Sequence, residues 1–445
     1  MTVAVAGPAF TPLSVALERL EDAASPLVGI VRQTMRTMHA PDETRLPNSA
    51  CDLASARRTL GVTAVEYGSG ADRDESGARA AAIGEALERY CGMYVPPERV
   101  RVATARALGD AAVDPARFGL FRDDQVARPG FPFAPFTLDT RTTFVEGESL
   151  EDGSSVQLPA DVVYLGRVAP GPRPIAYSTT SGLACGPTRD EACLAALLEL
   201  VERDAVMLAW NNRLSLPLLE WSDDPGAVDL ERDYFEPTGL RYSVLDGCAF
   251  LGVPVAISVL HGPPGSRAAL ALGAGCASTV QRAWLKALSE SFGVYRWLGM
   301  ELASSPEAPL PSAAEVKTFD QHMLYYADEE RARLASFLDA SSTRTALRDV
   351  RPLEGSTPRE QIEAVLRRLA RHGISAYAVD VTTPDVASLG LHVARVIAPE
   401  LCQLDVWHEA RFLGCPRLYT AACDVGLATA PLEPADVNPH PHPFP

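Results

Sequence analysis

The sequence of 445 residues is poor in lysine, which occurs only at Lys286 and Lys317, so arginine supplies almost all of the positive charge. The formal net charge is −17. General nucleic-acid binders and proteins that bind anionic membranes need a basic surface, so this charge balance argues against both classes.

Two further features are missing. The nine cysteines contain no C-x-x-C pair, which argues against a structural zinc ribbon, and their odd, scattered set fits reduced thiols in the cytoplasm. No run of about 18 apolar residues occurs, and the first residues lack the charged and apolar regions of a signal peptide. We therefore expect a cytoplasmic protein without a membrane segment. Its hydrophobic content of 47% suffices for a large core.

A motif of the form E-x-x-E-R occurs twice, at residues 85–89 and 199–203, and each copy lies in an alanine- or leucine-rich run with helical spacing. Residues three and four apart share one face of a helix, so each copy places two carboxylates and a guanidinium on one stripe. The residues are Glu85, Glu88 and Arg89 in the first copy, and Glu199, Glu202 and Arg203 in the second.

The simplest interpretation of each copy is an i,i+4 ion pair on a solvated helix, worth about 0.3–0.5 kcal/mol. The apolar flanks of both helices favour burial instead, and buried charges need partners. Four carboxylates brought together in a cleft need a cation. Magnesium fits, because it binds a few carboxylates and takes other ligands from water and substrate phosphates, which the arginines would also face.

The order of expected elements indicates a mixed α/β fold with flanking helices. Helices are expected over residues 14–22, from a cap at Asp72 or Asp74 to about Tyr90, from Thr188 through the second motif, and over 277–297, 326–339 and 358–372. The last part of helix 277–297 holds Glu290. Strands are expected at residues 143–147, 162–165, 240–245, 253–260, 268–275, 376–381 and 393–398. The segment 34–61 is expected to be loop-rich, 67–71 a glycine turn, and 94–135 irregular with one short helix near 103–108.

The chain closes on a proline-rich segment, with proline at every second position from Pro439 to Pro445. Such spacing enforces an extended polyproline II conformation. Such an end is usually a solvated tail or a ligand for an aromatic groove on another protein. A stiff tail loses little entropy on docking, however, so it could also hold a terminal carboxylate in the protein's own cleft. We expect a main domain over residues 1–429 and this tail over 430–445.

Several segments together resemble one family, the YcaO proteins, and within it the azoline-forming cyclodehydratases that act on ribosomally synthesised peptides. They span nearly the whole chain in the family's order: Ser25-Pro-Leu-Val-Gly-Ile-Val, Gly84-Glu-Ala-Leu-Glu-Arg-Tyr, Ser181-Gly-Leu-Ala-Cys-Gly, Glu199-Leu-Val-Glu-Arg-Asp, Thr318-Phe-Asp-Gln-His-Met-Leu-Tyr-Tyr-Ala, Asp380-Val-Thr-Thr-Pro-Asp and the terminal Pro-His-Pro-Phe-Pro.

The resemblance implies a YcaO-like ATP-binding fold with ATP and Mg²⁺ as cofactors. It implies that a cysteine, serine or threonine side chain of a precursor peptide adds to the preceding amide, whose oxygen is phosphorylated by ATP before phosphate leaves. Metal ligands would be Glu85, Glu88, Glu199 and Glu202. Further nucleotide contacts would come from Ser69, Arg89, Ser181, Glu191, Arg203 and Glu290, and catalytic groups from Arg89, Arg203 and the carboxylate of Pro445. The resemblance also implies a separate leader-binding partner, because the N-terminal segment is short for such a domain, and a homodimer.

The chain departs from the family pattern at Ser69, where a lysine is usual, at Ala81, where a serine is usual, and at Ser181 and Gly293, where an asparagine and a glutamine are expected. Two alternatives to azoline formation stay open, and these departures suggest the second of them. One is thioamide or amidine formation on a peptide backbone, and the other is a non-catalytic scaffold subunit of a peptide-modifying complex.

Overall fold

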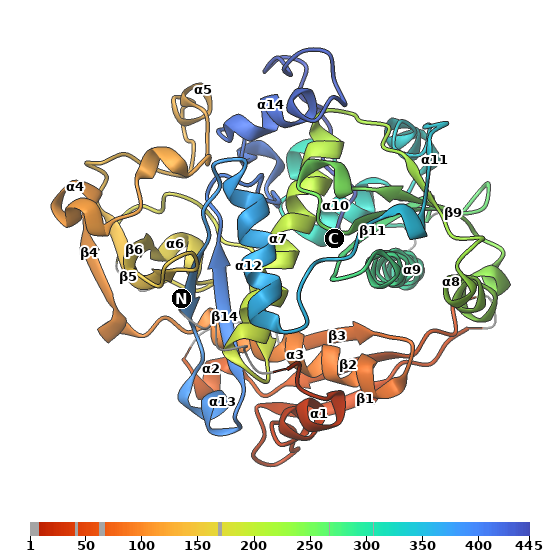
Figure 1. The fold of residues 1–445 in the computed structure, drawn as a ribbon, viewed down its shortest axis with the longest axis horizontal. Helices are drawn as coiled ribbons and strands as arrows, with labels where there is room; N and C mark the ends of the chain where they lie inside the picture. Colours follow the sequence, from red (N-terminus) through yellow and green to blue (C-terminus); the bar gives the residue numbers. More distant parts are fainter. Residues whose placement is uncertain (1–8, 41–42, 62–66, 168–170, 267, 306) are drawn as a thin grey trace, which may run out of the picture. The chain divides into compact units, whose positions relative to one another are not determined.

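The computed structural model describes residues 9–40, 43–61, 67–167, 171–266, 268–305 and 307–445 (Figure 1). The chain divides into two compact units. The first comprises Met1–Thr37, Pro47–Leu200 and Glu354–Leu401, and the second comprises Met38–Leu46, Val201–Leu353 and Cys402–Pro445. Helix α7 (Arg189–Asn211) contributes its first half to the first unit and its second half to the second. Both units mix helices and strands, which confirms the expected fold class.

The first unit holds two sheets whose described strand pairs are all antiparallel. One sheet has the order β1 (Val31–Arg36), β2 (Asn48–Leu53) and β3 (Tyr67–Ala71). The other has the order β4 (Val100–Ala103), β5 (Thr142–Ser149), β13 (Tyr377–Asp380), β14 (His392–Ile397) and β7 (Leu183–Gly186), with β6 (Ser155–Pro159) paired to β5. Strands β3 and β7 are thus terminal strands of their sheets.

Helix α3 (Glu75–Met93) is central to the first unit, because it packs on β2 and β3 and also contacts β7 and β14 (Figure 1). It begins as expected at an acidic cap, where the Asp74 carboxylate accepts a hydrogen bond from the Gly77 N–H at 2.8 Å. The other helices of this unit are α1 (Leu13–Glu21), α2 (Ala56–Thr59), α4 (Ala105–Leu108), α5 (Asp123–Val126), α6 (Ala160–Val163), α12 (Pro358–Ala370) and α13 (Pro384–Ser388).

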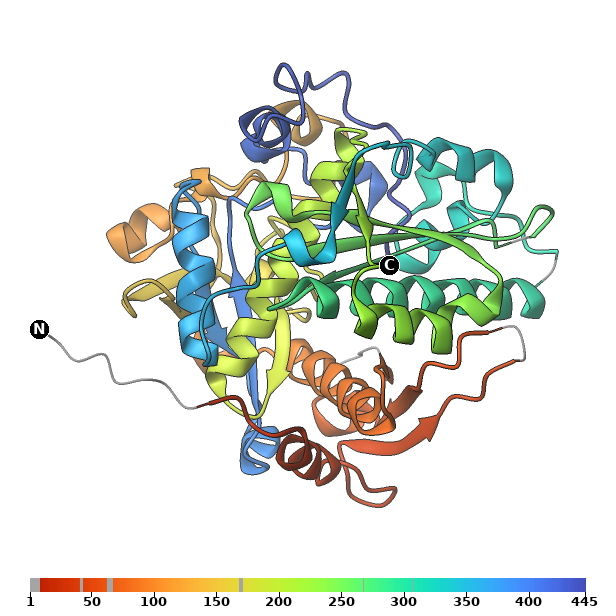
Figure 2. The same ribbon diagram turned by 45° about the vertical axis from the view of Figure 1, so that its right-hand side comes forward.

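The second unit is built on one sheet with the order β11 (Leu270–Cys276), β10 (Val255–His261), β9 (Arg241–Asp246), β8 (Leu218–Glu220) and β12 (Arg344–Ala346). Only the β8–β12 pair of its described strands is parallel. The long helix α9 (Val280–Ser304) packs along β10 and β11 (Figure 2). The remaining helices are α8 (Pro225–Leu230), α10 (Phe319–Tyr325), α11 (Glu329–Ala332) and α14 (Pro416–Asp424).

Glycines let a helix approach a terminal strand in both units. A Cβ atom at Gly70 of β3 would lie 2.5 Å from the backbone nitrogen of Ala82 in α3, and one at Gly275 of β11 would lie 2.2 Å from the carbonyl oxygen of Ala283 in α9. No side chain fits at such distances. The expectation of a turn at residues 67–71 is therefore wrong, since these glycines belong to a strand that contacts a helix backbone.

Most of the longer expected elements are present, but three further expectations are wrong. The segment 162–165 falls partly in helix α6 rather than a strand, since a short, wholly buried apolar run has no diagnostic periodicity. The segment 34–61 contains β2 and α2, missed because the β2 sequence NSACDL holds residues that disfavour strands. No single helix covers 326–339, because the Asp328 side chain caps a new one-turn helix, α11.

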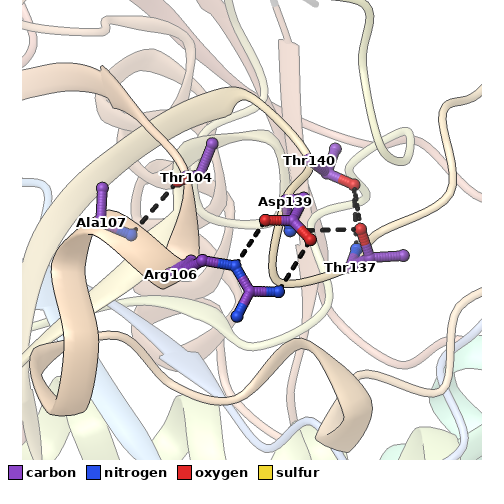
Figure 3. Close-up of polar contacts among 6 residues, drawn as sticks. All are labelled: Thr104, Arg106, Ala107, Thr137, Asp139 and Thr140. Carbon is purple, nitrogen blue, oxygen red and sulfur yellow. Dashed lines mark hydrogen bonds and ion pairs between the residues drawn. The ribbon is translucent and has the colours of Figure 1, made fainter.

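The connection between β4 and β5 contains the short helix expected near residues 103–108. Thr104 caps α4 by accepting a hydrogen bond from the Ala107 N–H at 3.2 Å, as Figure 3 shows. The Arg106 guanidinium holds the Asp139 carboxylate through two hydrogen bonds of 2.6 and 2.8 Å. Both side chains are well exposed, so this pair tethers the loop with little effect on stability.

None of the helices among the described residues combines the length and apolarity that crossing a bilayer requires.

A matched pair of glycine substitutions tests the close contact between β11 and α9. Gly275→Ala should destabilise the protein by about 1–3 kcal/mol or more, because its Cβ would overlap helix backbone. Gly293→Ala, within α9 itself, meets no atom within 4 Å and should be neutral or stabilising by about 0.5–1 kcal/mol through helix propensity. Chemical denaturation followed by circular dichroism measures both. Equal effects of the two substitutions would contradict the proposed role of Gly275.

Candidate functional site

Glu85 on α3 is fixed by the neighbouring terminal strand of the first unit. Its Oε2 atom accepts a hydrogen bond of 2.5 Å from the Ser69 N–H of β3 and lies 3.2 Å from the Ser69 hydroxyl. Its Oε1 atom accepts from Arg89 at 2.7 Å. The Arg89 guanidinium also donates to the Tyr67 carbonyl at 2.8 Å and lies 4.7 Å from the centre of the Tyr67 ring. Three predicted site residues therefore form one network.

Glu88, one turn further along α3, accepts a hydrogen bond of 2.8 Å from the Cys185 N–H of β7. The pKa of Glu88 is raised to about 8, mainly by burial, with the Cys185 amide lowering it and the nearby carboxylates of Glu199 and Glu85 raising it. The structure thus brings Glu199 of the second motif within electrostatic range of the two glutamates of the first motif. A cation beside them would favour the ionised form of Glu88.

Glu199 on α7 completes this group. Its Oε2 atom accepts a hydrogen bond of 3.1 Å from the Gly182 N–H, just before β7. Gly182 has a φ of +78°, and a Cβ there would lie 2.6 Å from the Val396 carbonyl oxygen. Only glycine suits this conformation and space, so the glycine of the Ser181-Gly182 pair aims an amide at Glu199.

Two glutamates of the second unit are held in the same manner. Glu202 on α7 accepts a hydrogen bond of 2.7 Å from the Cys276 N–H, and Glu290 on α9 accepts one of 2.6 Å from the Ala274 N–H, both in β11. Burial raises the pKa of Glu290 to about 7, with Arg203 lowering it and Glu202 raising it. The Arg203 guanidinium lies 3.5 Å from the Glu202 carboxylate.

Arg203 also contacts the proline-rich tail. Its guanidinium lies 4.5 Å from the centre of the Phe444 ring, and Phe444 is fully buried. The neighbouring Pro445 is partly buried. The tail therefore packs inside the second unit against a predicted phosphate-binding residue, whereas a catalytic role for the Pro445 carboxylate stays a prediction.

Two predicted site residues, Glu191 and Ser181, make contacts other than the glutamate–amide hydrogen bonds described above. Glu191, in the first turn of α7, accepts hydrogen bonds from the Thr11 N–H at 2.7 Å, the Thr11 hydroxyl at 2.9 Å and the Thr188 hydroxyl at 2.7 Å. Both of its oxygens are thus engaged in anchoring the N-terminal segment. Ser181 is buried, and its N–H lies 3.3 Å from the Thr179 hydroxyl. Roles for both in nucleotide binding stay predictions.

The sequence pointed to the glutamates but not to the backbone amides that hold them. Those amides belong to Ser69, Gly182, Cys185, Ala274 and Cys276. The repeated Gly-x-Gly in 68–70 and 273–275 was the available signal, because in each case the residue between the glycines donates to a helix glutamate. Burial raises the pKa of the Cys185 thiol well above its usual value, which disfavours a nucleophilic thiolate at this position.

These donors fit Mg²⁺ with a nucleotide better than a metal held by protein alone. Among the described residues no group of three or more His, Cys, Asp or Glu side chains has a metal-binding arrangement. Mg²⁺ does not require one, because it keeps waters and takes substrate phosphates as ligands. The partly buried, mutually repelling carboxylates of Glu88, Glu199 and Glu85 supply hard oxygens whose ionised forms a cation would stabilise.

The raised pKa of Glu88 makes a prediction about stability in the absence of cofactors. From pH 4.5 to about 8 the folded protein keeps a proton on Glu88 that the unfolded chain releases, so the free energy of unfolding falls as pH rises through this window. Glu88→Gln removes this dependence. Thermal unfolding should show equal melting temperatures at about pH 4 and a variant that is more stable by a few degrees at about pH 9. The exposed Glu146→Gln serves as control, and a variant that is less stable at high pH would contradict the prediction.

Known structures share this fold. A heterocyclase solved in complex with substrate and cofactor superposes with a TM-score of 0.79 at 26% identity, covering 98% of this chain and 57% of that one. The chain thus spans little more than half of that heterocyclase. A YcaO protein of Methanopyrus kandleri, bound with AMPPCP and Mg²⁺, matches with a TM-score of 0.60 at 20% identity, covering 90% of this chain and 94% of that one.

Sequence comparison agrees. An uncharacterised protein of Methanothermobacter thermautotrophicus is 27% identical over 351 residues, which cover 77% of this chain and 82% of that protein. A family model described as YcaO cyclodehydratase with ATP and Mg²⁺ binding matches residues 67–402, a range that includes every glutamate discussed above. The chain therefore belongs to the YcaO family, and its cofactors are ATP and Mg²⁺.

Proposed function

We propose that this protein is an ATP-dependent peptide cyclodehydratase. The thiol or hydroxyl of a cysteine, serine or threonine in a precursor peptide adds to the carbonyl carbon of the preceding amide. The resulting oxyanion takes the γ-phosphate of ATP, releasing ADP. The amide nitrogen then expels phosphate and loses its proton, which leaves a thiazoline or oxazoline ring. The net change is loss of one water from the peptide and hydrolysis of one ATP.

The observation that carries this proposal is the set of five helix glutamates held by backbone amides in, or directly before, terminal strands. Phosphoryl transfer asks a protein mainly to position groups and neutralise charge. In each glutamate one carboxylate oxygen accepts a backbone N–H, which fixes the side chain before substrate arrives. Preorganised carboxylates of this kind suit the binding of a metal-bound triphosphate.

We assign roles to the chain's own residues accordingly. Glu85, Glu88, Glu199 and Glu202 would hold Mg²⁺, which neutralises phosphate charge when bound. Arg89 and Arg203 would face the phosphates, since each guanidinium is already oriented by a glutamate and an aromatic ring. Ser69, Ser181, Glu191 and Glu290 would support the nucleotide, and the Pro445 carboxylate would orient or accept a proton from the attacking group.

The substrate and partners follow from the same proposal. The heterocyclase that shares the fold at 26% identity was solved with its substrate and cofactor. For this chain we propose a ribosomal precursor peptide as substrate, presented by a separate protein that binds its leader segment, and a homodimeric enzyme.

The departure at Ser69 gives no support to the scaffold alternative. Its backbone N–H and hydroxyl both contact Glu85, so this residue keeps a defined role in the carboxylate network. A scaffold would also have no use for an ionisable Glu88 held at a raised pKa among other carboxylates.

The proposal is tested by incubating the purified protein with ATP, the precursor peptide and the leader-binding partner. Mass spectrometry then measures the mass of the peptide, and a second assay measures ADP release. One ADP and the loss of one water per ring are expected. Exchange of an amide oxygen for sulfur or for an amine nitrogen would instead establish the thioamide or amidine alternative. ATP binding no stronger than buffer controls in calorimetry would establish a scaffold.

Two substitutions sharpen this test. Glu202→Gln and Arg203→Lys should each lower kcat for dehydration by at least about 100-fold. The first removes a fixed negative charge, and the second keeps the positive charge but removes the planar guanidinium that can bind a phosphate through two hydrogen bonds. Glu307→Gln, an exposed position of the second unit, is the matched control and should leave kcat unchanged. Retention of full activity in both site variants would overturn the role assigned to these residues.

A further inference from the structure

The proline-rich tail is recognised through its backbone carbonyls. Its prolines carry no N–H, so the tail cannot pair as a strand, and its carbonyl oxygens are left to accept from side chains. Four of them do so within the second unit: Asn438 from Arg411 at 2.6 Å, His440 from Trp210 at 3.1 Å, Pro441 from Tyr326 at 2.5 Å, and His442 from His322 at 2.8 Å. Aromatic and polar side chains of this kind bind a polyproline segment by donating hydrogen bonds to its carbonyl oxygens.

His322 on α10 holds the innermost of these carbonyls. Only 1% of its surface is exposed, and its two ring nitrogens face two carbonyl oxygens, Nδ1 that of His442 at 2.8 Å and Nε2 that of Val406 at 3.0 Å. Burial lowers the pKa of His322 to about 4, so the ring is neutral at physiological pH and carries a single N–H. Only one of the two carbonyls can therefore accept a hydrogen bond.

His442, the tail residue beside it, transmits this contact toward Arg203. Its ring stacks on the His322 ring with centres 3.9 Å apart and planes 17° apart. Its Nδ1 accepts from the Phe444 N–H at 3.3 Å, so its Nε2–H donates to the Asp405 carbonyl at 2.5 Å. The Phe444 ring then lies under Arg203. A continuous series of contacts runs from His322 through His442 and Phe444 to the guanidinium.

We propose that His322 is a positioning residue that acts through the tail: its Nδ1–H donates to the His442 carbonyl and so places Phe444 against Arg203. This inference rests on the proposed function, because Arg203 is assigned there to the phosphates. We assign the proton to Nδ1 because its carbonyl contact is the shorter of the two, which leaves Nε2 against Val406 without a hydrogen.

Two substitutions separate the ring nitrogens. In His322→Asn the side-chain amide NH₂ can occupy the place of Nδ1, and in His322→Gln it can occupy that of Nε2. Hydrogen exchange of the C-terminal segment, followed by mass spectrometry, reports tail docking without reference to catalysis. The Asn variant should keep the protection of the Phe444 and His440 amides, and the Gln variant should lose it by at least tenfold in exchange rate.

Activity measurements give the second readout. The Gln variant should lose at least tenfold in kcat for dehydration with the KM for ATP little changed, while the Asn variant stays within about threefold of the parent. His372→Asn, an exposed histidine after α12, is the matched control and should match the parent in both measurements. Equal exchange in the Asn and Gln variants, or greater protection in the Gln variant, would overturn the assignment.

Two further measurements decide the matter if both variants unfold. In the unmutated protein, ¹⁵N NMR of labelled histidine should show the neutral His322 ring protonated at Nδ1, and protonation at Nε2 would refute the proposal. Tyr326→Phe removes only the hydroxyl that donates to Pro441 and should raise tail exchange several-fold. If tail exchange responds as described but no dehydration is seen with any peptide, the positioning role stands and the proposed reaction fails.

Discussion

The terminal strands of three sheets would expose unpaired N–H groups along their outer edges, and helix glutamates accept hydrogen bonds from them. Strands β3 and β11 supply the amides of Ser69, Ala274 and Cys276, and β7 with the residue before it supplies those of Cys185 and Gly182. Each such hydrogen bond satisfies an N–H group at the edge of a sheet and also fixes the position of a carboxylate. The rest of the site depends on it, because unfixed glutamates of like charge would turn away from one another.

Glycine makes this contact possible. At Gly68, Gly70, Gly273 and Gly275 an added Cβ would lie between 2.2 and 2.5 Å from helix backbone. The helix can therefore lie against the strand closely enough for a glutamate to reach a backbone amide. Burial raises the pKa values of Glu88 and Glu290, which is the cost of assembling carboxylates before a cation arrives. Stability and function are thus opposed at these positions.

The tail follows a complementary principle. Glycine allows a helix backbone to contact a strand backbone, whereas the alternating prolines of the tail lack the N–H donors that pairing with another backbone needs. The carbonyl oxygens of the tail therefore accept hydrogen bonds from side chains of the second unit. Burial of Phe444 and His442 then sets the tail in one place, so a segment without regular secondary structure is nevertheless ordered.

Local sequence determined the long helices, their acidic caps and the mixed α/β class, because 3.6-residue periodicity and capping chemistry are properties of neighbouring residues. It also identified the E-x-x-E-R carboxylates, since their spacing is helical. Tertiary structure alone decided that 67–71 is a strand, that Glu191 anchors the N-terminal segment while Glu88 meets Glu199, and that His322 binds the tail. The strand at 67–71 pairs with β2. The other three depend on which backbone amide or carbonyl lies opposite a side chain, and residues 97 to 180 positions away along the chain supply those partners.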